Sequence, residues 1–379
     1  MMSQHKKLLP VLIALVLALI GSIFFFNWRL RSVSETMGYG SVDGNLNIIQ
    51  KIRYSIQIYM VRERLVNEKT PPDLKSVLEI QSGETVQSVC NHLNLLYPNL
   101  NSKLCRNYLV YRGLDRKVEP GSYTIPEGYP AFQVFQFIAN PLNRNRNLLI
   151  FPGWRLEEIA AAIQTLGLKE VSAEVLLENL KMPVVLLANE LQLEPGQSLE
   201  GYILPGEYIF EPGASLNELL WQMTTPIREL LTSGELQAKG QMQGLSTGEV
   251  LTLASIIQRE TLQAEEMPRM ASVFINRLAQ GMPLQTDPTV QYAIGYDQIS
   301  ASWWKPVLSM ADLQINSIYN TYLVKGLPPA PISAPGRDAI QAVLNPETTD
   351  FFFFRAKCDG SGLHDFSETY QEHLDKACP

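Results

Sequence analysis

The chain has 379 residues, of which 46% are hydrophobic and 18% are charged. A chain of this length and composition can bury the cores of two or three domains, which excludes an intrinsically disordered protein. The formal net charge is -7 and the body of the chain has no basic run, which argues against a nucleic-acid partner.

The N-terminal region predicts a membrane anchor. No charged residue occurs between Lys7 and Arg29, and residues 8–26 form an apolar run long enough to cross a bilayer as a helix. Trp28 follows at the position of an interfacial aromatic residue. A cleaved signal peptide is the alternative, but no small-x-small cleavage site follows the run. We therefore expect residues 1–30 to be a cytoplasmic tail and a single transmembrane helix, with the body of the chain on the extracytoplasmic side of the membrane.

The four cysteines favour the same location. Cys90 and Cys105, and likewise Cys358 and Cys378, are close in sequence, and an even number in an exported chain favours two disulfides. Local pairing is one of three connectivities, and buried free thiols are the alternative. No Cys/His spacing resembles a zinc site, so we expect no metal and no cofactor.

Residues 31–76 are expected to form a tether and a juxtamembrane helix. Residues 32–47 are rich in Ser and Gly, which is typical of a flexible tether. Residues 48–66 carry apolar side chains at helical spacing, and Thr70-Pro-Pro-Asp73 then breaks the helix.

Two sequence patterns occur twice in the middle of the chain. Ile-x-x-Gly-x-x-apolar occurs at 80–86 and at 150–156, and Pro-Gly-x-Tyr occurs at 120–123 and at 205–208. A helical run follows each of them. Each copy therefore contains strand, helix, connector, strand and helix, and we expect its two strands to pair as a small sheet covered by helices.

The first copy resembles a LysM module, in which a Gly-x-Thr turn leads from a strand into a helix, here Gly83-Glu-Thr85. LysM modules commonly bind glycans that contain N-acetylglucosamine, so the resemblance implies a glycan contact; a scaffold that only positions the next domain is the alternative. We assign residues 77–146 to this LysM-like module. Residues 147–243 form a second strand-helix module that is part of the catalytic region, and their aromatic, Gly-rich and acidic segment 199–208 suits a strand edge near a sugar groove.

One predicted helix carries a carboxylate in an apolar setting. Ser246 and Glu249 have the spacing of a capping box, which predicts a helix start, and apolar residues recur at helical spacing as far as Ile257. Glu260 projects from the flank of that stripe. A carboxyl group held against apolar surface keeps its proton near neutral pH, as a general acid must. A solvated residue at the edge of an amphipathic helix is the alternative.

A second helix is predicted to start near Pro268 and to stop at Gly281. The irregular polar segment 282–290 follows between prolines, where site residues tend to lie. For Asp287 in this segment, a turn residue before proline is the alternative. We predict that the ligand is bound by polar residues of this segment and of residues 319–321, namely Gln285, Thr286, Asp287, Tyr319, Asn320 and Thr321.

The C-terminal part of the chain, residues 244–379, contains an ordered series of motifs. They are Leu253-Ala-Ser-Ile256, Arg259-Glu-Thr261, residues 271–278 and 281–290, Tyr319-Asn-Thr-Tyr322, Gly326-Leu-Pro-Pro329 and the tail between His364 and His373. Together they resemble the MltG (YceG-like) family of membrane-bound endolytic murein transglycosylases. By this resemblance Glu260 is the catalytic acid, and we expect the six predicted binding residues to hold the sugar and its N-acetyl groups. The family usually has a Glu two residues earlier, where this chain has Gln258. Because Glu260 itself is present, this departure affects only a supporting role of position 258.

The expected fold class is α+β, with an N-terminal transmembrane helix and LysM-like small modules followed by a mixed α/β catalytic domain whose core is residues 244–379. The resemblance implies a lyase that cleaves the β-1,4 bond between N-acetylmuramic acid and N-acetylglucosamine in nascent glycan strands. Strand elongation then ends with 1,6-anhydro products, alongside peptidoglycan synthases. The resemblance also implies a single-pass protein of the bacterial inner membrane with its catalytic body on the periplasmic side. Two alternatives stay open: a hydrolytic muramidase with Asp287 as its second carboxylate, and a non-catalytic glycan-binding cell-wall assembly factor.

Overall fold

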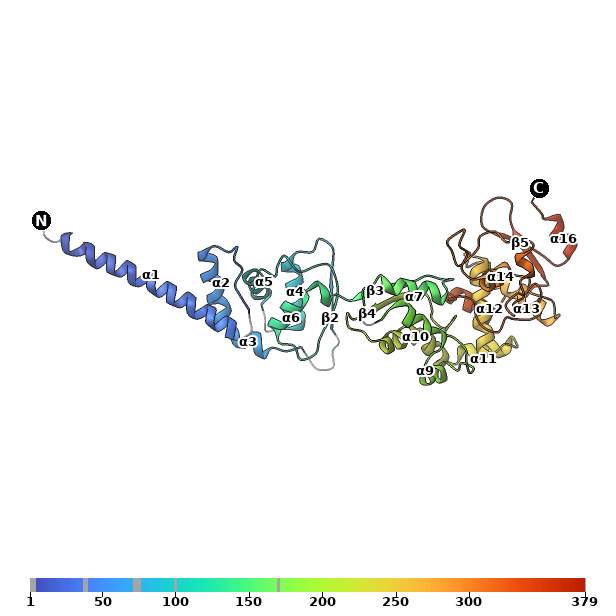
Figure 1. Cartoon of the computed structure of the whole chain (residues 1–379), viewed down its shortest axis with the longest axis horizontal. Coiled ribbons are helices and arrows are strands. Elements are labelled where there is room, and N and C mark those ends of the chain that lie inside the picture. The colour runs from blue at the N-terminus through green and yellow to red at the C-terminus, as the bar shows by residue number, and fades with distance from the viewer. Residues whose placement is uncertain (1–4, 37–39, 71–75, 99–100, 169–170, 379) are drawn as a thin grey trace. The chain divides into compact units, whose positions relative to one another are not determined.

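The computed structural model describes the chain apart from residues 1–4, 37–39, 71–75, 99–100, 169–170 and 379. It divides into two compact units, residues 1–146 and 147–379 (Figure 1). Both units combine helices with two-stranded sheets, so the α+β fold class is confirmed. The Pro-Pro breaker predicted within residues 70–73 lies mostly outside the described residues.

The first unit begins with three helices, α1 (His5–Thr36), α2 (Ile48–Met60) and α3 (Arg62–Asn67). The expected transmembrane helix is not confirmed, since no helix in the described part of the chain has both the length and the apolar character that a membrane crossing requires. The tether expected at 32–47 starts later than predicted, because α1 continues to its end at Thr36. The helix expected at 48–66 is divided at Val61, whose backbone (φ -118, ψ 11) departs from helical geometry.

The rest of the first unit follows the predicted repeat. Its elements are β1 (Ser76–Ile80), α4 (Val86–Leu96), α5 (Ser102–Arg112), β2 (Gly121–Ile125), α6 (Ala131–Ile138) and the short η1 (Pro141–Asn143). The two strands pair antiparallel, with Leu78 opposite Tyr123, so the predicted pairing is confirmed. Both of these side chains are buried, because the inward face of the small sheet is covered by the helices.

The second unit opens with the second copy of the repeat. Its elements are β3 (Arg146–Ile150), α7 (Leu156–Gln164), α8 (Ala173–Lys181), α9 (Val185–Glu190), β4 (Gly206–Phe210) and α10 (Leu216–Thr232). The two strands again form their own sheet, as predicted. Tyr202 and Tyr208 of the expected strand edge are buried in the core.

The remaining elements form the C-terminal part of the same unit. They are α11 (Glu235–Met242), α12 (Thr247–Glu260), α13 (Met267–Ala279), α14 (Asp287–Ile294), η2 (Asp312–Gln314), α15 (Arg337–Leu344), β5 (Phe353–Ala356), β6 (His364–Ser367) and α16 (Tyr370–Asp375). Residues 287–294, which were expected in part to be irregular, are helical. Pro288 is accepted in the first helical turn, because the backbone N–H that proline lacks would have no partner within the helix there.

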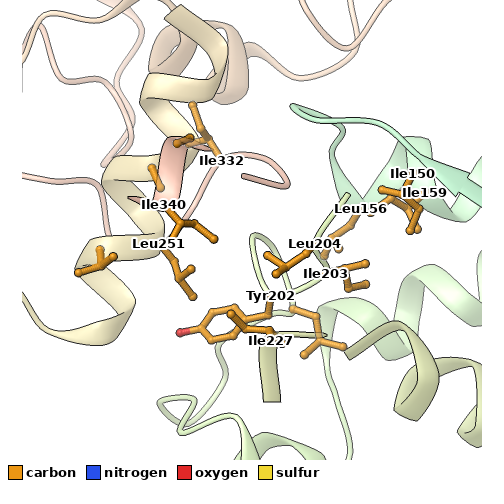
Figure 2. Close-up of a cluster of buried hydrophobic side chains, with 14 of the residues drawn as sticks. Ile150, Leu156, Ile159, Tyr202, Ile203, Leu204, Ile227, Leu251, Ile332 and Ile340 are labelled. Atoms are coloured by element: carbon orange, nitrogen blue, oxygen red, sulfur yellow. The ribbon is translucent and has the colours of Figure 1, made fainter. Parts of the chain in front are cut away.

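One continuous core joins both parts of the second unit. Its buried side chains extend from Leu148 to Phe366, and α12 packs within it against α11, α13, α14 and α15. Figure 2 shows part of this core, with Leu251 and Ile340 on one side and Leu156 and Leu204 on the other. The strand-helix module and the C-terminal elements are therefore fixed to each other by shared hydrophobic burial.

The four cysteines form two disulfides, each between cysteines that are close in sequence. Cys90 in α4 is joined to Cys105 in α5, and Cys358 is joined to Cys378 across the C-terminal hairpin and helix. Each bridge closes a short loop, of 15 and 20 residues respectively, within one unit.

Candidate active site

Helix α12 holds Glu260 at a fixed position. The Oγ of Ser246 accepts a hydrogen bond from the Glu249 N–H, and the Glu249 carboxylate accepts one from the Ser246 N–H over 2.8 Å, so the predicted capping box is present. Every residue from Val250 to Gln258 is buried. Glu260 is the last helical residue and, unlike residues 250–258, is partly accessible to solvent.

The surroundings of Glu260 favour a protonated carboxyl group. Burial, aided by the negative charge of Asp287, raises the pKa of Glu260 to about 8 against the opposing charges of Arg277 and Arg259. At neutral pH the group therefore carries a proton that it can donate. After donation, the two guanidinium groups stabilise the carboxylate that remains.

Arg277 is a buried cation with fixed geometry. Its guanidinium group donates hydrogen bonds of 2.6 Å to the carbonyl oxygens of Leu284 and Phe352, and it lies beside the ring of Phe353. These contacts tie α13 to the segment before α14 and to β5. The sequence-based prediction missed Arg277, although its spacing of three residues from the buried Phe274 places it on the core face of α13.

Arg259 lies on an aromatic face at the end of α12. Its guanidinium carbon is 3.8 Å from the centre of the Trp304 ring. A Cβ atom at Gly153, where φ is +82, would be 3.0 Å from the Arg259 side chain, so this turn of the strand-helix module leaves room for the arginine. The module therefore helps to orient a cation that acts on Glu260.

Asp287 begins α14 and is paired with a tyrosine. The hydroxyl of Tyr322 donates a hydrogen bond of 2.6 Å to Oδ1 of Asp287. Both Asp287 and the preceding exposed Gln285 remain accessible. Gln285 has a left-handed backbone (φ 53), which is uncommon for a residue with a side chain and is found more often at functional sites.

The other predicted sugar-binding residues differ in position. Thr286, Asn320 and Thr321 are at most 1% exposed, and their polar groups bond within the protein. Thr321 bonds to Thr289 over 2.8 Å, which fastens the start of α14 to the segment 319–322. In this structure the three side chains are used within the protein, so their predicted contact with sugar stays a prediction. Tyr319 remains partly accessible.

A second buried carboxyl group secures the other end of α14. Glu200 is 2% exposed, and its Oε2 accepts hydrogen bonds of 3.4 Å from the Leu156 N–H and the Tyr292 hydroxyl. Its Oε1 has no hydrogen-bond partner among the residues that the structure describes. Burial, with the charge of Glu157, raises the pKa of Glu200 to about 8, and Arg155 opposes the shift.

Arg155 also contacts Tyr292 at the C-terminal end of α14. Its guanidinium group donates to the backbone carbonyl oxygen of Tyr292 over 3.3 Å and lies 4.2 Å from the centre of the Tyr292 ring. The strand-helix module therefore binds the C-terminal turn of α14, the helix that begins at Asp287. No local sequence pattern predicted this cluster, because Arg155 and Tyr292 are 137 positions apart in the chain.

Gln258 occupies the position at which the resemblance leads one to expect glutamate. It is buried, and its Oε1 accepts a hydrogen bond of 2.9 Å from the Gly336 N–H. This contact positions the loop before α15. Among the described residues, no group of three or more His, Cys, Asp or Glu side chains is placed to hold a metal ion.

Comparisons with known proteins identify the family of the chain. A model of the YceG-like family matches residues 78–378, so the chain belongs to the YceG-like family. It is 30% identical over 307 residues to an endolytic murein transglycosylase of Bacillus subtilis, covering 78% of this chain and 82% of that protein. It is 28% identical over 249 residues to an endolytic murein transglycosylase of Streptococcus pneumoniae, covering 64% of this chain and 42% of that protein.

A crystal structure of a YceG-like protein from Listeria monocytogenes has a similar fold. The TM-score is 0.54 at 27% sequence identity, covering 82% of this chain and 99% of that one. The family expected from the sequence is thus confirmed. Like its relatives from B. subtilis and S. pneumoniae, the chain is a lytic transglycosylase, an enzyme of the lyase class.

Proposed function

We propose that the chain cleaves peptidoglycan within its glycan strands, at the β-1,4 bond between N-acetylmuramic acid and N-acetylglucosamine, with Glu260 as both acid and base. The observation that carries this proposal is the protonated, partly accessible carboxyl group of Glu260 at the end of a buried helix. The names of the relatives from B. subtilis and S. pneumoniae support murein as the substrate class.

The reaction needs one carboxyl group. Protonated Glu260 donates its proton to the glycosidic oxygen, and the bond from that oxygen to C1 of N-acetylmuramic acid breaks. The resulting carboxylate is stabilised by Arg277 and Arg259. It then accepts the proton of the 6-hydroxyl group of the same sugar while O6 bonds to C1. Because the nucleophile is tethered to the reacting ring, a 1,6-anhydro product forms without water.

Hydrolysis is a second candidate reaction, because Asp287 is a carboxylate near Glu260. Its charge raises the pKa of Glu260, and its carboxylate is exposed, so it could activate a water molecule as the second carboxylate of a muramidase. The two reactions leave different ends. The lyase leaves 1,6-anhydro ends, and the hydrolase leaves reducing ends.

The cellular setting is part of the proposal. Two disulfides support a location outside the cytoplasm, because such bonds persist in oxidising compartments. The order strand, helix, helix, strand in residues 76–125 supports a LysM-like module that contacts glycan. We also propose that cleavage terminates strand elongation beside peptidoglycan synthases, an expectation that comes from the family resemblance.

The test is digestion of purified glycan strands by the full chain and by Glu260→Gln, with the products identified by mass spectrometry. Wild type should release 1,6-anhydro ends, and Glu260→Gln should fold and release none. The matched control is Glu265→Gln, which alters an exposed carboxylate in the following loop and should retain cleavage. Reducing ends from wild type would favour hydrolysis, and an undigested strand would favour a non-catalytic binding protein.

A further inference from the structure

An open pocket of about 680 Å³ lies at the end of α12 opposite Glu260. The loop 191–198, helix α11, the first turns of α12 and the segment 328–330 form its walls. Its volume is within the range of about 300–1,000 Å³ that is usual for small-ligand sites. Glu260 is not among its lining residues, so the pocket is separate from the site of bond cleavage.

The lining of the pocket matches an uncharged amino sugar. Carboxamide side chains of Gln192, Gln197, Gln237 and Gln241 line it, and each can both donate and accept hydrogen bonds. Hydroxyl and N-acetyl groups need both kinds of partner. Tyr319 adds the apolar ring face against which a pyranose ring packs.

The charge of the pocket excludes anionic groups. Glu194 and Glu249 are the charged residues of its lining, which includes no Lys, Arg or His among the described residues that form it. Peptides attached to N-acetylmuramic acid carry carboxylates, which these two glutamates repel. The pocket therefore favours the N-acetylglucosamine units of a strand over its peptide-bearing units.

One short segment of the chain, residues 319–322, connects the pocket to the surroundings of Glu260. Tyr319 lines the pocket, and Tyr322, one short turn later, bonds to Asp287, which acts on Glu260. Along α12, Thr252 lines the pocket, and a helical rise of about 1.5 Å per residue puts it roughly 12 Å from Glu260. A bound strand must therefore extend beyond the cleaved sugar to reach the pocket.

We propose that this pocket is a distal glycan subsite, which holds an N-acetylglucosamine unit of the strand that Glu260 cleaves. The proposal rests on the proposed peptidoglycan-cleaving function. It predicts a preference for cleavage within long strands, because only a long strand fills both the pocket and the cleavage position. Binding energy gained in the pocket then adds to kcat/KM for long substrates alone.

The first experiment measures kcat/KM on peptide-free glycan oligomers of increasing length. The test variant combines Gln237→Ala and Gln241→Ala, both on exposed faces of α11, where alanine preserves the helix. The ratio of kcat/KM on long over short oligomers should fall by about three- to tenfold, the effect of losing one or two hydrogen bonds. The control, Gln371→Ala on α16, should leave the ratio unchanged. An unchanged ratio in the double variant overturns the proposal.

The second experiment needs no cleavage. Calorimetry measures binding of a linear N-acetylglucosamine tetramer to full-length Glu260→Gln, with and without the two α11 substitutions. The substitutions should weaken binding by about three- to tenfold. If wild type cleaves no strand, the proposed function fails, while weakened tetramer binding still supports the glycan pocket. Unchanged tetramer binding overturns the pocket proposal. The proposal is also overturned if a peptide-bearing strand binds more tightly than the tetramer and the two substitutions abolish that binding, since the pocket would then hold peptide.

Discussion

The hydroxyl of Tyr322 donates a hydrogen bond of 2.6 Å to Oδ1 of Asp287, the first residue of α14. This pair holds a carboxylate close enough to Glu260 to raise the pKa of the proposed catalytic group. The proton of Glu260, which starts the proposed reaction, is therefore retained mainly by burial and partly by a neighbouring negative charge. The two contributions can be separated by mutation.

Asp287→Asn should lower the pKa of Glu260, because it removes the like charge while keeping a partner for Tyr322. The alkaline limit of kcat/KM should move down by about one pH unit. A pH profile of strand cleavage measures this shift. Asp338→Asn, which removes an exposed carboxylate on α15, should leave the profile in place. Complete loss of cleavage by Asp287→Asn at every pH would instead make Asp287 a direct participant, as hydrolysis requires.

Wild-type cleavage should itself report the protonation of Glu260. The general acid acts in its protonated form, and its pKa is about 8, so kcat/KM should stay level below that pH. Above it, kcat/KM should fall by about tenfold per pH unit. Initial rates on glycan oligomers between pH 6 and pH 10 measure the curve. A rate that rises through pH 8 would contradict the assignment of Glu260 as the initial acid.

Local sequence signals predicted the part of the site that lies on one helix. The capping box at Ser246 and the apolar periodicity up to Ile257 fixed the start and orientation of α12, and hence the position of Glu260. Strand pairing was also predictable, because each copy of the repeat presents two short strands that cannot be buried alone.

Contacts between distant segments were not predictable in this way. Glu200 meets Tyr292 across 92 residues, and no local rule states which buried groups will meet. Thr286 and Thr321 were expected to hold sugar because polar residues in loops are usually exposed, yet they bond to each other within the protein. Pro288 was taken as a mark of irregular structure, although the first turn of a helix accepts proline.

Glu200→Gln should stabilise the protein most at alkaline pH. The pKa of Glu200 is about 8 in the folded chain and 4.5 in the reference state, so the folded state binds more protons between these values. The stability of wild type therefore decreases as pH rises from about 4.5 to about 8. Glutamine cannot ionise and can still accept the bonds from Leu156 and Tyr292.

The measurement for this variant is urea denaturation at pH 5 and pH 8. The gain in unfolding free energy of Glu200→Gln over wild type should be larger at pH 8 by at least ~1 kcal/mol. Glu194→Gln, a neighbouring exposed carboxylate, should show no such difference. Equal gains at the two pH values would mean that Glu200 is already ionised in the folded protein.

Removal of one disulfide should affect the two units unequally. Cys90→Ser with Cys105→Ser opens a 15-residue loop between α4 and α5 in the first unit, which should lower the stability of that unit by about 3 kcal/mol. Glu260 and its neighbours lie in the second unit, whose core is continuous and separate. Calorimetric unfolding should therefore show one transition at a lower temperature, while cleavage of soluble glycan oligomers by the folded second unit continues. Simultaneous loss of both transitions would show that the second unit depends on the first for its stability.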